Sequence, residues 1–343
     1  MHDFNLNLNS IWFILVGVLF TGYAMLDGFD LGIGALHLFA KKDEERRILL
    51  NSIGPVWDGN EVWLVTGGGA LFAAFPNAYA TAFSGFYLAL YLLLAALIFR
   101  AVAIEFRSKK PMFWWRQMWD ISFSIGSVLS ALLIGVALGN LAEGVPLDSN
   151  GEFAGTFLGL LRPYPLLVGV STVALFMMHG AIYGVMKTEG ELHDKLRVWT
   201  VRCIIFFVIC AVTLTMATLL YVPHIAQRVH DNPWLFSIAL ANMLAIANIP
   251  REFHHGRDWF AFLSSCAAMI TLMMLFAVDA YPYLIYSWPN PDNSLTIYNA
   301  ASSPKTLGNM LIIAVIGVPV VLAYTACIYW IFRGKVKLGH MSY

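Results

Sequence analysis

Charged residues are scarce in this sequence, since Asp, Glu, Lys and Arg together make up 12% of its 343 residues, against about a quarter in soluble domains. Hydrophobic residues reach 59% and the mean hydropathy is +0.68, which is more apolar surface than a soluble fold can hide. Basic and acidic residues balance at 21 each, so no net positive charge is available to hold nucleic acid. The composition therefore predicts an all-α integral membrane protein that lies in a lipid bilayer and binds no nucleic acid.

Cysteine is also rare, and none of the four cysteines belongs to a CxxC pair or a haem-attachment motif. The sequence therefore predicts buried, inert thiols rather than disulfides or a thiolate metal site. It also lacks a phosphate-binding loop, an HExxH motif and a nucleophile elbow, so the chain alone does not resemble a complete enzyme. No Lys or Arg precedes the first apolar run, and we expect that run to be retained as a helix rather than cleaved as a signal.

Apolar runs of about 20 residues are long enough to cross a bilayer as helices. The second and seventh runs are the weakest, because one is rich in glycine and the other is short and bounded by Pro233 and Pro250. We predict nine transmembrane helices at 10–38, 59–75, 78–106, 118–142, 164–187, 198–222, 233–249, 258–281 and 306–333.

Basic residues are distributed unevenly among the loops between these predicted helices. Sixteen lie on one side of the membrane, and the other side has only Arg162, Arg228 and Lys305. Cytoplasmic loops carry the excess of Lys and Arg, so we expect the N-terminus outside and the C-terminus in the cytoplasm. The longest outer loop, Tyr281 to Lys305, is expected to form an ordered lid or contact loop.

A weak internal repeat is visible at an offset of 152 residues, where LVGV at 15–18 recurs at 167–170. The same offset aligns Gly28 with Gly180 and Gly32 with Gly184. This repeat predicts a pseudo-repeat of two four-helix bundles plus one extra helix within a single membrane domain, residues 1–343. The three parts are 1–145, 160–282 and 305–333.

Polar side chains inside predicted spans are costly and mark functional candidates. Two acidic pairs at i,i+3 spacing lie in the cytoplasmic half of the first two spans, and this spacing places each pair on one helix face. Acids that change protonation state could carry protons inward from the cytoplasm; as structural elements, they could instead cap a helix (Asp58 or Asn60) or neutralise a cation. The proton-path candidates are Asp27, Asp30, Asp58 and Glu61, and the structural or charge-partner candidates are Arg100, Glu105 and Asp120.

His179 is the one histidine well inside a predicted span, and imidazole can ligate haem iron. A transmembrane haem usually needs a second axial ligand, and His37 lies only at the end of the first span. We therefore favour a hydrogen-bonded core histidine over a haem ligand, and we predict no metal site.

Four motifs in the first third of the chain resemble subunit II of cytochrome bd-type quinol oxidases. The resemblance is specific from about Ile11 to Lys109 and continues more loosely to the C-terminus through the KTEG turn at 187–190. The motifs are LDGFDLGIG at 26–34, IGPVWDGNEVWL at 53–64, AAFPNAYATAFSGFY at 73–87 and RAVAIEFRSK at 100–109.

The resemblance implies a membrane oxidase of the bacterial plasma (inner) membrane that oxidises quinol and reduces O2 to water with cytoplasmic protons. It implies that haems b558, b595 and d lie in a partner, subunit I, and that this chain is its haem-free subunit II. Small single-helix accessory subunits are further potential partners, and some family members hold a quinone in subunit II. Asp58 matches a family position implicated in proton delivery, and Trp63 matches a residue near the proposed entrance of an O2 tunnel. Where some members carry Gln, this sequence has Glu61, which would add a carboxyl to the path.

The resemblance, together with four acids in one half of the bilayer, leads to the expectation that the face bearing Asp27, Asp30, Asp58 and Glu61 packs on subunit I and lines a hydrated proton route. Two alternatives stay open at this point. Intramembrane carboxylates with an internal repeat also suit a proton-coupled secondary transporter, and the chain could be a purely structural assembly subunit.

Overall fold

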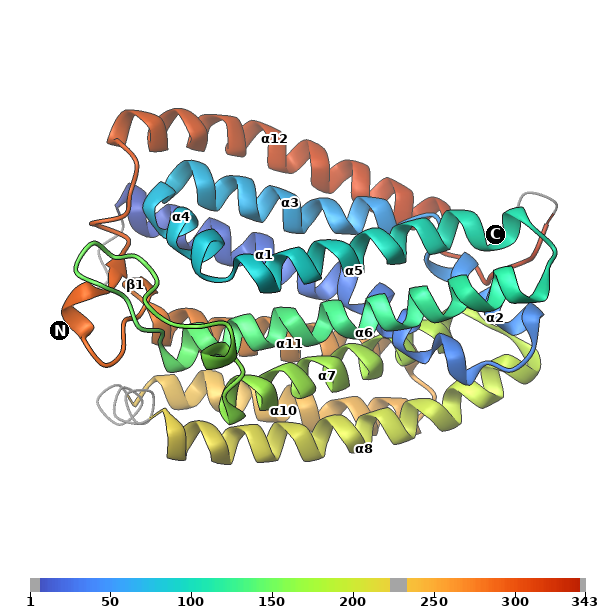
Figure 1. Cartoon of the computed structure of the whole chain (residues 1–343). Helices are drawn as coiled ribbons and strands as arrows, with labels where there is room; N and C mark the ends of the chain where they lie inside the picture. Colours follow the sequence, from blue (N-terminus) through green and yellow to red (C-terminus); the bar gives the residue numbers. More distant parts are fainter. Residues whose placement is uncertain (1–6, 223–232, 340–343) are drawn as a thin grey trace.

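The computed structural model describes residues 7–222 and 233–339, and Figure 1 shows a bundle of long, roughly aligned helices. The prediction of an all-α chain is confirmed for this part, apart from one small two-stranded sheet. The helices are α1 (Leu8–Leu36), α2 (Asp43–Ile53), α3 (Trp57–Ala74), α4 (Pro76–Gly85), α5 (Tyr87–Phe106), α6 (Phe113–Glu143), α7 (Pro163–Lys187), α8 (Gly190–Tyr221), α10 (Leu235–His254), α11 (Asp258–Ala280) and α12 (Pro304–Ile331). Single 3-10 turns cover His37–Phe39, Arg107–Lys109, Leu158–Leu160 and Pro291–Asn293.

Seven helices are long and apolar enough to cross a membrane: α1, α5, α6, α7, α8, α11 and α12. The other two predicted spans, 59–75 and 233–249, are helical as α3 and α10 but lie outside this set. They are the two runs that the sequence marks as weakest, because polar and glycine residues dilute their apolar character. The count of nine spans therefore stays a prediction.

Three boundaries differ from the sequence prediction. The predicted span 78–106 is divided at Phe86, since α4 ends at Gly85 and α5 begins at Tyr87. A Cβ at Gly85 would lie 2.7 Å from Phe153, so glycine lets this side chain pack into the corner. Pro250 lies inside α10 instead of closing it, which membrane helices tolerate. The segment 43–53 is not a loop but an amphipathic helix, α2, because its apolar side is buried against the bundle.

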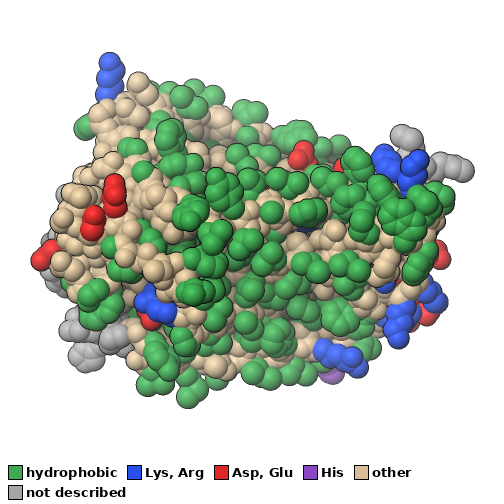
Figure 2. All heavy atoms as spheres, in the orientation of Figure 1, with side chains coloured by type: hydrophobic (Ala, Val, Ile, Leu, Met, Phe, Trp, Pro, Cys, Tyr) green, Lys and Arg blue, Asp and Glu red, His purple; other side chains and the backbone are tan. Residues whose placement is uncertain are grey.

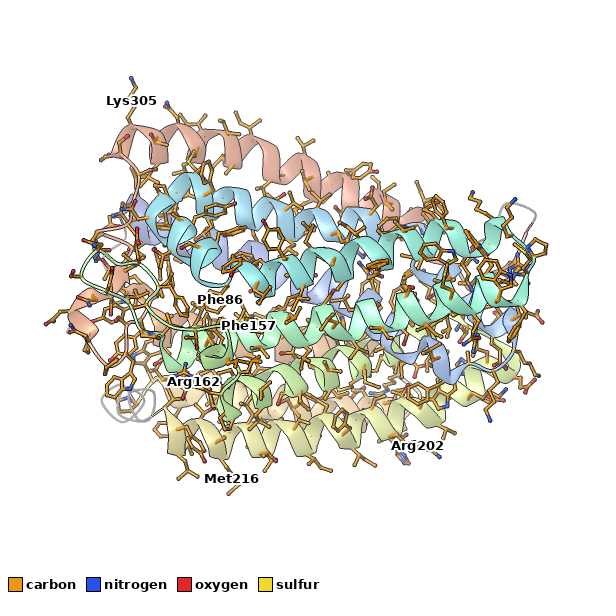
Figure 3. All side chains as sticks on the ribbon, in the orientation of Figure 1. Phe86, Phe157, Arg162, Arg202, Met216 and Lys305 are labelled. Atoms are coloured by element: carbon orange, nitrogen blue, oxygen red, sulfur yellow. The ribbon has the colours of Figure 1, made fainter. Side chains whose placement is uncertain are left out.

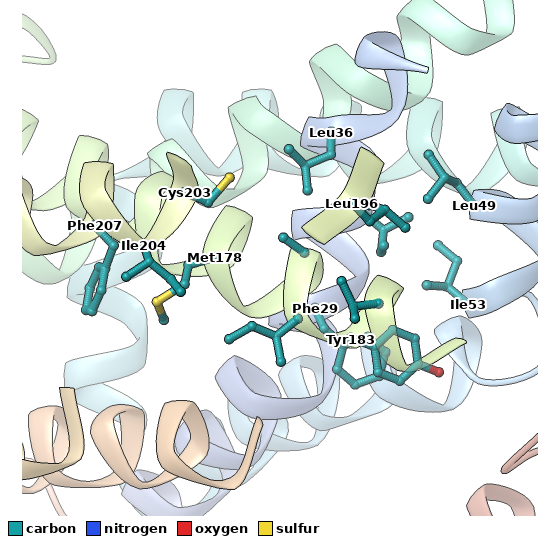
Figure 4. Close-up of a cluster of buried hydrophobic side chains, with 14 of the residues drawn as sticks. Phe29, Leu36, Leu49, Ile53, Met178, Tyr183, Leu196, Cys203, Ile204 and Phe207 are labelled. Carbon is teal, nitrogen blue, oxygen red and sulfur yellow. The ribbon is translucent and has the colours of Figure 1, made fainter. Parts of the chain in front are cut away.

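Close packing of α1 against α7 forms the centre of the bundle. A Cβ at Gly32 would collide with the backbone carbonyl of Phe176 and would lie 2.9 Å from the Cα of Gly180. Around this contact Phe29 stacks on Tyr183 at 4.0 Å between ring centroids. Figure 4 shows the apolar cluster that surrounds it, with side chains from α1, α2, α7 and α8 directed toward one another. Small residues on two helices thus bring their backbones together, as is common in membrane bundles.

The loop between Tyr281 and Lys305 is ordered, as expected, and its position on the outer side stays a prediction. Between Tyr281 and Lys305 the chain forms β1 (Tyr283–Ile285) and β2 (Leu295–Thr296), paired antiparallel. Ile285 and Ile297 are buried in a second apolar cluster. Ser287 also forms a bridge with Val145, two residues after the end of α6, so this loop is joined to the first predicted unit at this end of the bundle.

On the face drawn in Figure 2, charged side chains gather toward the ends of the bundle. In the view of Figure 2, hydrophobic side chains cover the flank, and most Lys and Arg lie at the end where α5 and α6 meet. Lys305 and Arg162 lie toward the opposite end, and Arg202 points outward from α8 (Figure 3). Arg228 and the N-terminal segment Met1–Asn5 are outside the described residues. The membrane orientation and the division into two four-helix units stay predictions.

All four cysteines are free thiols, as predicted, and Cys203 and Cys210 are buried. The expectation of buried thiols is wrong for Cys327, which is exposed. Its helix, α12, lies on the outside of the bundle, and Leu307 is the one residue that it buries.

Candidate functional site: a buried carboxyl–arginine cluster

Five polar residues meet inside the bundle near the start of α3, and we call them the Arg100 cluster: Asp27, Asp30, Asn60, Glu61 and Arg100. Asp27 and Asp30 lie one turn apart on α1, and Arg100 reaches them from α5. Asn60 and Glu61 come from the first turns of α3. Asp27, Asp30 and Arg100 are completely buried, and the Glu61 side chain keeps 21% of its surface exposed.

Arg100 holds two of the three acids directly. Its Nη2 donates to Oδ1 of Asp27 at 2.7 Å, and its Nη1 donates to Oε1 of Glu61 at 2.6 Å. The distance from Nη2 to Oδ2 of Asp30 is 3.9 Å, which is too long for a hydrogen bond. The i,i+3 spacing therefore brings both aspartates to one cation, as the sequence predicts, but only Asp27 is hydrogen-bonded to it.

Asp30 is supported by neutral groups instead. Nδ2 of Asn60 donates to Oδ2 of Asp30 at 2.8 Å and to the backbone carbonyl of Leu26 at 3.1 Å. The Tyr329 hydroxyl, on α12, donates to Oδ1 of Asn60 at 2.9 Å. The sequence offered no signal for this contact, because Tyr329 lies 269 residues away from Asn60.

The cluster contains more acids than cations. Three carboxyl groups share one guanidinium group, so full ionisation would leave two negative charges uncompensated in the interior. Such charges are costly in a low-dielectric environment. Among the described residues, Oδ2 of Asp27 and Oδ1 of Asp30 have no hydrogen-bond partner. The site is therefore chemically suited to bind and release protons.

The predicted common face for the four acids is wrong, because Asp27 and Asp30 are interior residues whereas Asp58 is exposed. Asp58 lies on an outward face of α3 together with exposed Val62, Val65 and Phe72. This division follows from the helix geometry, since positions 58, 62 and 65 lie on one side of α3 and Asn60 lies on the other. The predicted helix cap is also wrong, because α3 has Val56 as its N-cap, and Asp58 and Asn60 lie inside the helix.

Trp63 packs against the interior helix α1. A Cβ at Gly22 would lie 2.6 Å from Cζ3 of the indole, so the ring occupies the space that this glycine leaves open. Trp63 is half-buried, and it joins the outward face of α3 to the bundle centre.

A second ionic cluster holds the helix ends together where most of the basic residues gather. Asp120 on α6 is almost fully buried and accepts hydrogen bonds from three side chains. Nε2 of His37 lies 2.5 Å from Oδ1, Nε of Arg107 donates to the same oxygen at 2.5 Å, and Arg46 donates to Oδ2 at 2.8 Å. Asp120 is therefore in contact with cationic side chains, as a charge partner would be. Glu105 is half-buried on α5 between Arg100 and Arg107.

His179 is buried, and both nitrogens of its ring are hydrogen-bonded within the protein. Nδ1 lies 2.6 Å from the Ser265 hydroxyl, and Nε2 lies 3.0 Å from the carbonyl of Met25, to which it donates. The ring also stacks on Phe262 at 4.6 Å. Coordination of haem iron would require breaking one of these contacts, so the residue does not fit an axial ligand here. No group of three potential metal ligands occurs among the residues that the structure describes.

Comparisons with known proteins agree on one family. The family model described as cytochrome bd terminal oxidase subunit II matches residues 8–332. Cytochrome bd-I ubiquinol oxidase subunit 2 of Escherichia coli strain K12 is 39% identical, over 96% of this chain and 95% of that protein. Cytochrome bd ubiquinol oxidase subunit 2 of Bacillus subtilis strain 168 is 35% identical, over 96% and 97%. A chain in the structure of bd oxidase from Geobacillus thermodenitrificans shares the fold, with a TM-score of 0.78 at 16% identity, over 95% of this chain and 98% of that one.

Proposed function

Because this chain belongs to the cytochrome bd terminal oxidase subunit II family, we propose that it is the haem-free subunit II of a bd-type quinol oxidase. The complex couples quinol oxidation to reduction of O2 to water. A partner, subunit I, carries the haems that perform the redox chemistry. This chain packs on that partner in the bacterial inner membrane and contributes a route for protons from the cytoplasm.

The single observation that carries the proton route is the buried excess of carboxyl groups in the Arg100 cluster. Asp27 and Asp30 are fully buried, and Glu61 is partly exposed. Glu61 therefore gives the cluster a contact with its surroundings near the start of α3. A cluster with this composition can accept a proton on one side and release it on another without a large change of structure.

The outward face of α3 supports the packing on subunit I. Val62, Val65 and Phe72 are all exposed on this face and make it largely apolar. An acid in such a surface is better placed against a polar or hydrated region of a partner than against lipid. Asp58 then receives protons at the junction of the two subunits, and Glu61, one turn further along α3, leads from it toward the interior.

The experiment is Asp58→Asn in the intact two-subunit complex. We expect a loss of quinol oxidase turnover and proton uptake on the order of 10²-fold, the typical cost of a missing proton-transfer group. Haem content and yield should stay unchanged. Asp194→Asn is the matched control, because Asp194 is an exposed acid on α8 with no role in the route. Wild-type turnover and proton uptake in Asp58→Asn would show that the route is wrong.

The same experiment separates the proton route from a purely structural role. If the chain were only a scaffold, the Asp58→Asn complex would either have wild-type turnover or fail to assemble. A stable, haem-loaded but inactive complex supports the route. The transporter alternative has lost its basis, since the family match covers nearly the whole chain and the relatives are oxidase subunits.

A further inference from the structure

The three acids of the Arg100 cluster are not equivalent. Asp27 and Glu61 each accept a short hydrogen bond from the guanidinium group, at 2.7 and 2.6 Å. Asp30 lies 3.9 Å from the same group and receives its support from the amide of Asn60. The cation therefore stabilises the charged forms of Asp27 and Glu61 far more than that of Asp30.

The orientation of the Asn60 amide is determined by its surroundings. The carbonyl of Leu26 can only accept, so the amide atom 3.1 Å from it must be the nitrogen. The same nitrogen then donates to Oδ2 of Asp30 at 2.8 Å, and the amide oxygen faces the Tyr329 hydroxyl. Oδ2 of Asp30 is thus an acceptor, which leaves Oδ1 as the atom that can carry a proton.

Oδ1 of Asp30 has no hydrogen-bond partner among the described residues, although the side chain is fully buried. An ionised oxygen in this position would be a buried charge without a donor, which is the most costly arrangement for a carboxylate. A protonated oxygen removes this charge and leaves the Asn60 contact intact. Titratable groups near Asp30 come from five helices: Asp27 on α1, Glu61 on α3, Arg100 on α5, Tyr183 on α7 and Tyr329 on α12.

Tyr329 links the outermost helix to this carboxyl. Leu307 at the far end is the one buried residue of α12, so the helix as a whole makes little contact with the bundle. Its Tyr329 side chain is half-buried, packs edge-on to Phe29 and donates to Asn60. The hydroxyl is therefore a specific polar contact at the end of a loosely packed helix.

From these contacts we infer that Asp30 holds the exchangeable proton of the Arg100 cluster on Oδ1, and that Tyr329 is a positioning residue that orients this carboxyl through Asn60. The inference rests on the proposed proton route for its role in turnover, but the location of the proton does not depend on that role. Release of the proton leaves Asp30 as an anion held by the Asn60 amide, and uptake restores the neutral acid.

The test uses H2O-minus-D2O infrared difference spectra of the intact complex, in which a protonated carboxyl gives a C=O stretching band. We expect Asp30→Asn to remove one such band and Glu61→Gln, which alters the neighbouring acid, to retain it. Tyr329→Phe should shift the Asp30 band, because the Asn60 amide loses the hydrogen bond to its oxygen and keeps only the Leu26 contact beside its bond to Asp30. Tyr324→Phe is the matched control, since Tyr324 is an exposed tyrosine on the same helix, and its spectrum should equal that of the wild type.

The pH dependence of turnover supplies a second test. Without the Tyr329 hydroxyl, the anionic form of Asp30 loses support, so the pH midpoint of turnover should move up by roughly half a unit to one unit, the size of one neutral hydrogen bond. Tyr324→Phe should leave the profile unchanged. If Tyr329→Phe assembles poorly, Asn60→Ser breaks the same link and should shift the same band.

Two results would overturn the inference: an Asp30→Asn complex that keeps every carboxylic acid band, or a Tyr329→Phe complex with wild-type bands and pH profile. Failure of the proton route is distinguishable from either one. It would be seen as unaltered turnover in Asp58→Asn, whereas the bands are recorded without turnover.

Discussion

At the scale of single residues, the acids of this protein differ in the cations around them. Asp120 lies against two guanidinium groups, those of Arg46 and Arg107, and also contacts the His37 imidazole, whereas the three acids of the Arg100 cluster share one guanidinium group. A buried acid beside more than one cation suits a structural role, because these cations compensate the negative charge of its carboxylate. An acid in excess over cations is free to change its protonation state. The two clusters therefore suit different tasks, although both consist of Asp, Glu and Arg.

Removal of the Asp120 charge should destabilise the protein strongly. Asp120→Asn leaves Arg107, which is buried, without its main counter-charge, and a broken buried pair typically costs about 3–5 kcal/mol. Thermal unfolding of the purified complex should show a clearly lower midpoint. Glu44→Gln is the control, since Glu44 is an exposed acid on α2. Equal midpoints for the two variants would argue against a structural role for Asp120.

At the scale of elements, glycine determines which helices meet at the centre. Gly32 and Gly180 let the backbones of α1 and α7 touch, and Gly22 accommodates the Trp63 ring of α3. These contacts place Asp27 and Asp30 on the side of α1 that faces α3 and α5. The glycine-rich stretch in α3 acts differently, because a Cβ at Gly68 or Gly69 would meet nothing within 4 Å.

The α1–α7 contact can be tested with a pair of glycine variants. Gly32→Ala would push its methyl group into the carbonyl of Phe176, and overpacking of this kind costs about 1–3 kcal/mol. Gly17→Ala on the same helix meets no atom within 4 Å and should be neutral or slightly stabilising, since alanine favours helix. The readout is the thermal midpoint of the purified complex. A Gly32→Ala complex as stable as Gly17→Ala would contradict close packing at this position.

At the scale of the whole molecule, the uneven distribution of Lys and Arg between the two ends of the bundle predicts how the protein is oriented in the membrane. Most Lys and Arg gather at the end of the bundle where α5 and α6 meet, and the apolar flank between the ends matches a bilayer (Figure 2). Lys305 lies at the opposite end (Figure 3). The polar clusters described above lie near the basic end, at the start of α3 and the ends of α1 and α5, which is the end that we expect to face the cytoplasm.

Orientation can be measured by thiol labelling. In a variant with all four cysteines replaced by Ser, Lys305→Cys should react with a membrane-impermeant reagent in intact spheroplasts. Lys110→Cys should react only after lysis, because the basic end is expected to face the cytoplasm. Both lysines are exposed, so neither result depends on burial. Labelling of Lys110→Cys in intact spheroplasts would reverse the predicted topology.

The sequence by itself determined the membrane environment, the helical class and the family. Long apolar runs indicate directly that the folded chain lies in lipid. The family motifs at 26–34, 53–64, 73–87 and 100–109 are each continuous in sequence, so they can be recognised without the tertiary structure. It also predicted that Asp27 and Asp30 share a helix face, since i,i+3 spacing is a local property.

Only the tertiary structure decided which helix faces are covered. In the folded chain Asp58 lies on an exposed face, and Arg100 is hydrogen-bonded to Asp27 and Glu61 but not to Asp30. Tyr329 contacts Asn60, although 269 positions separate them in the sequence. Local spacing cannot predict these outcomes, because almost every face of a membrane helix is apolar. The side that turns inward is selected by packing between distant segments, here by the glycines that let α1 and α7 approach.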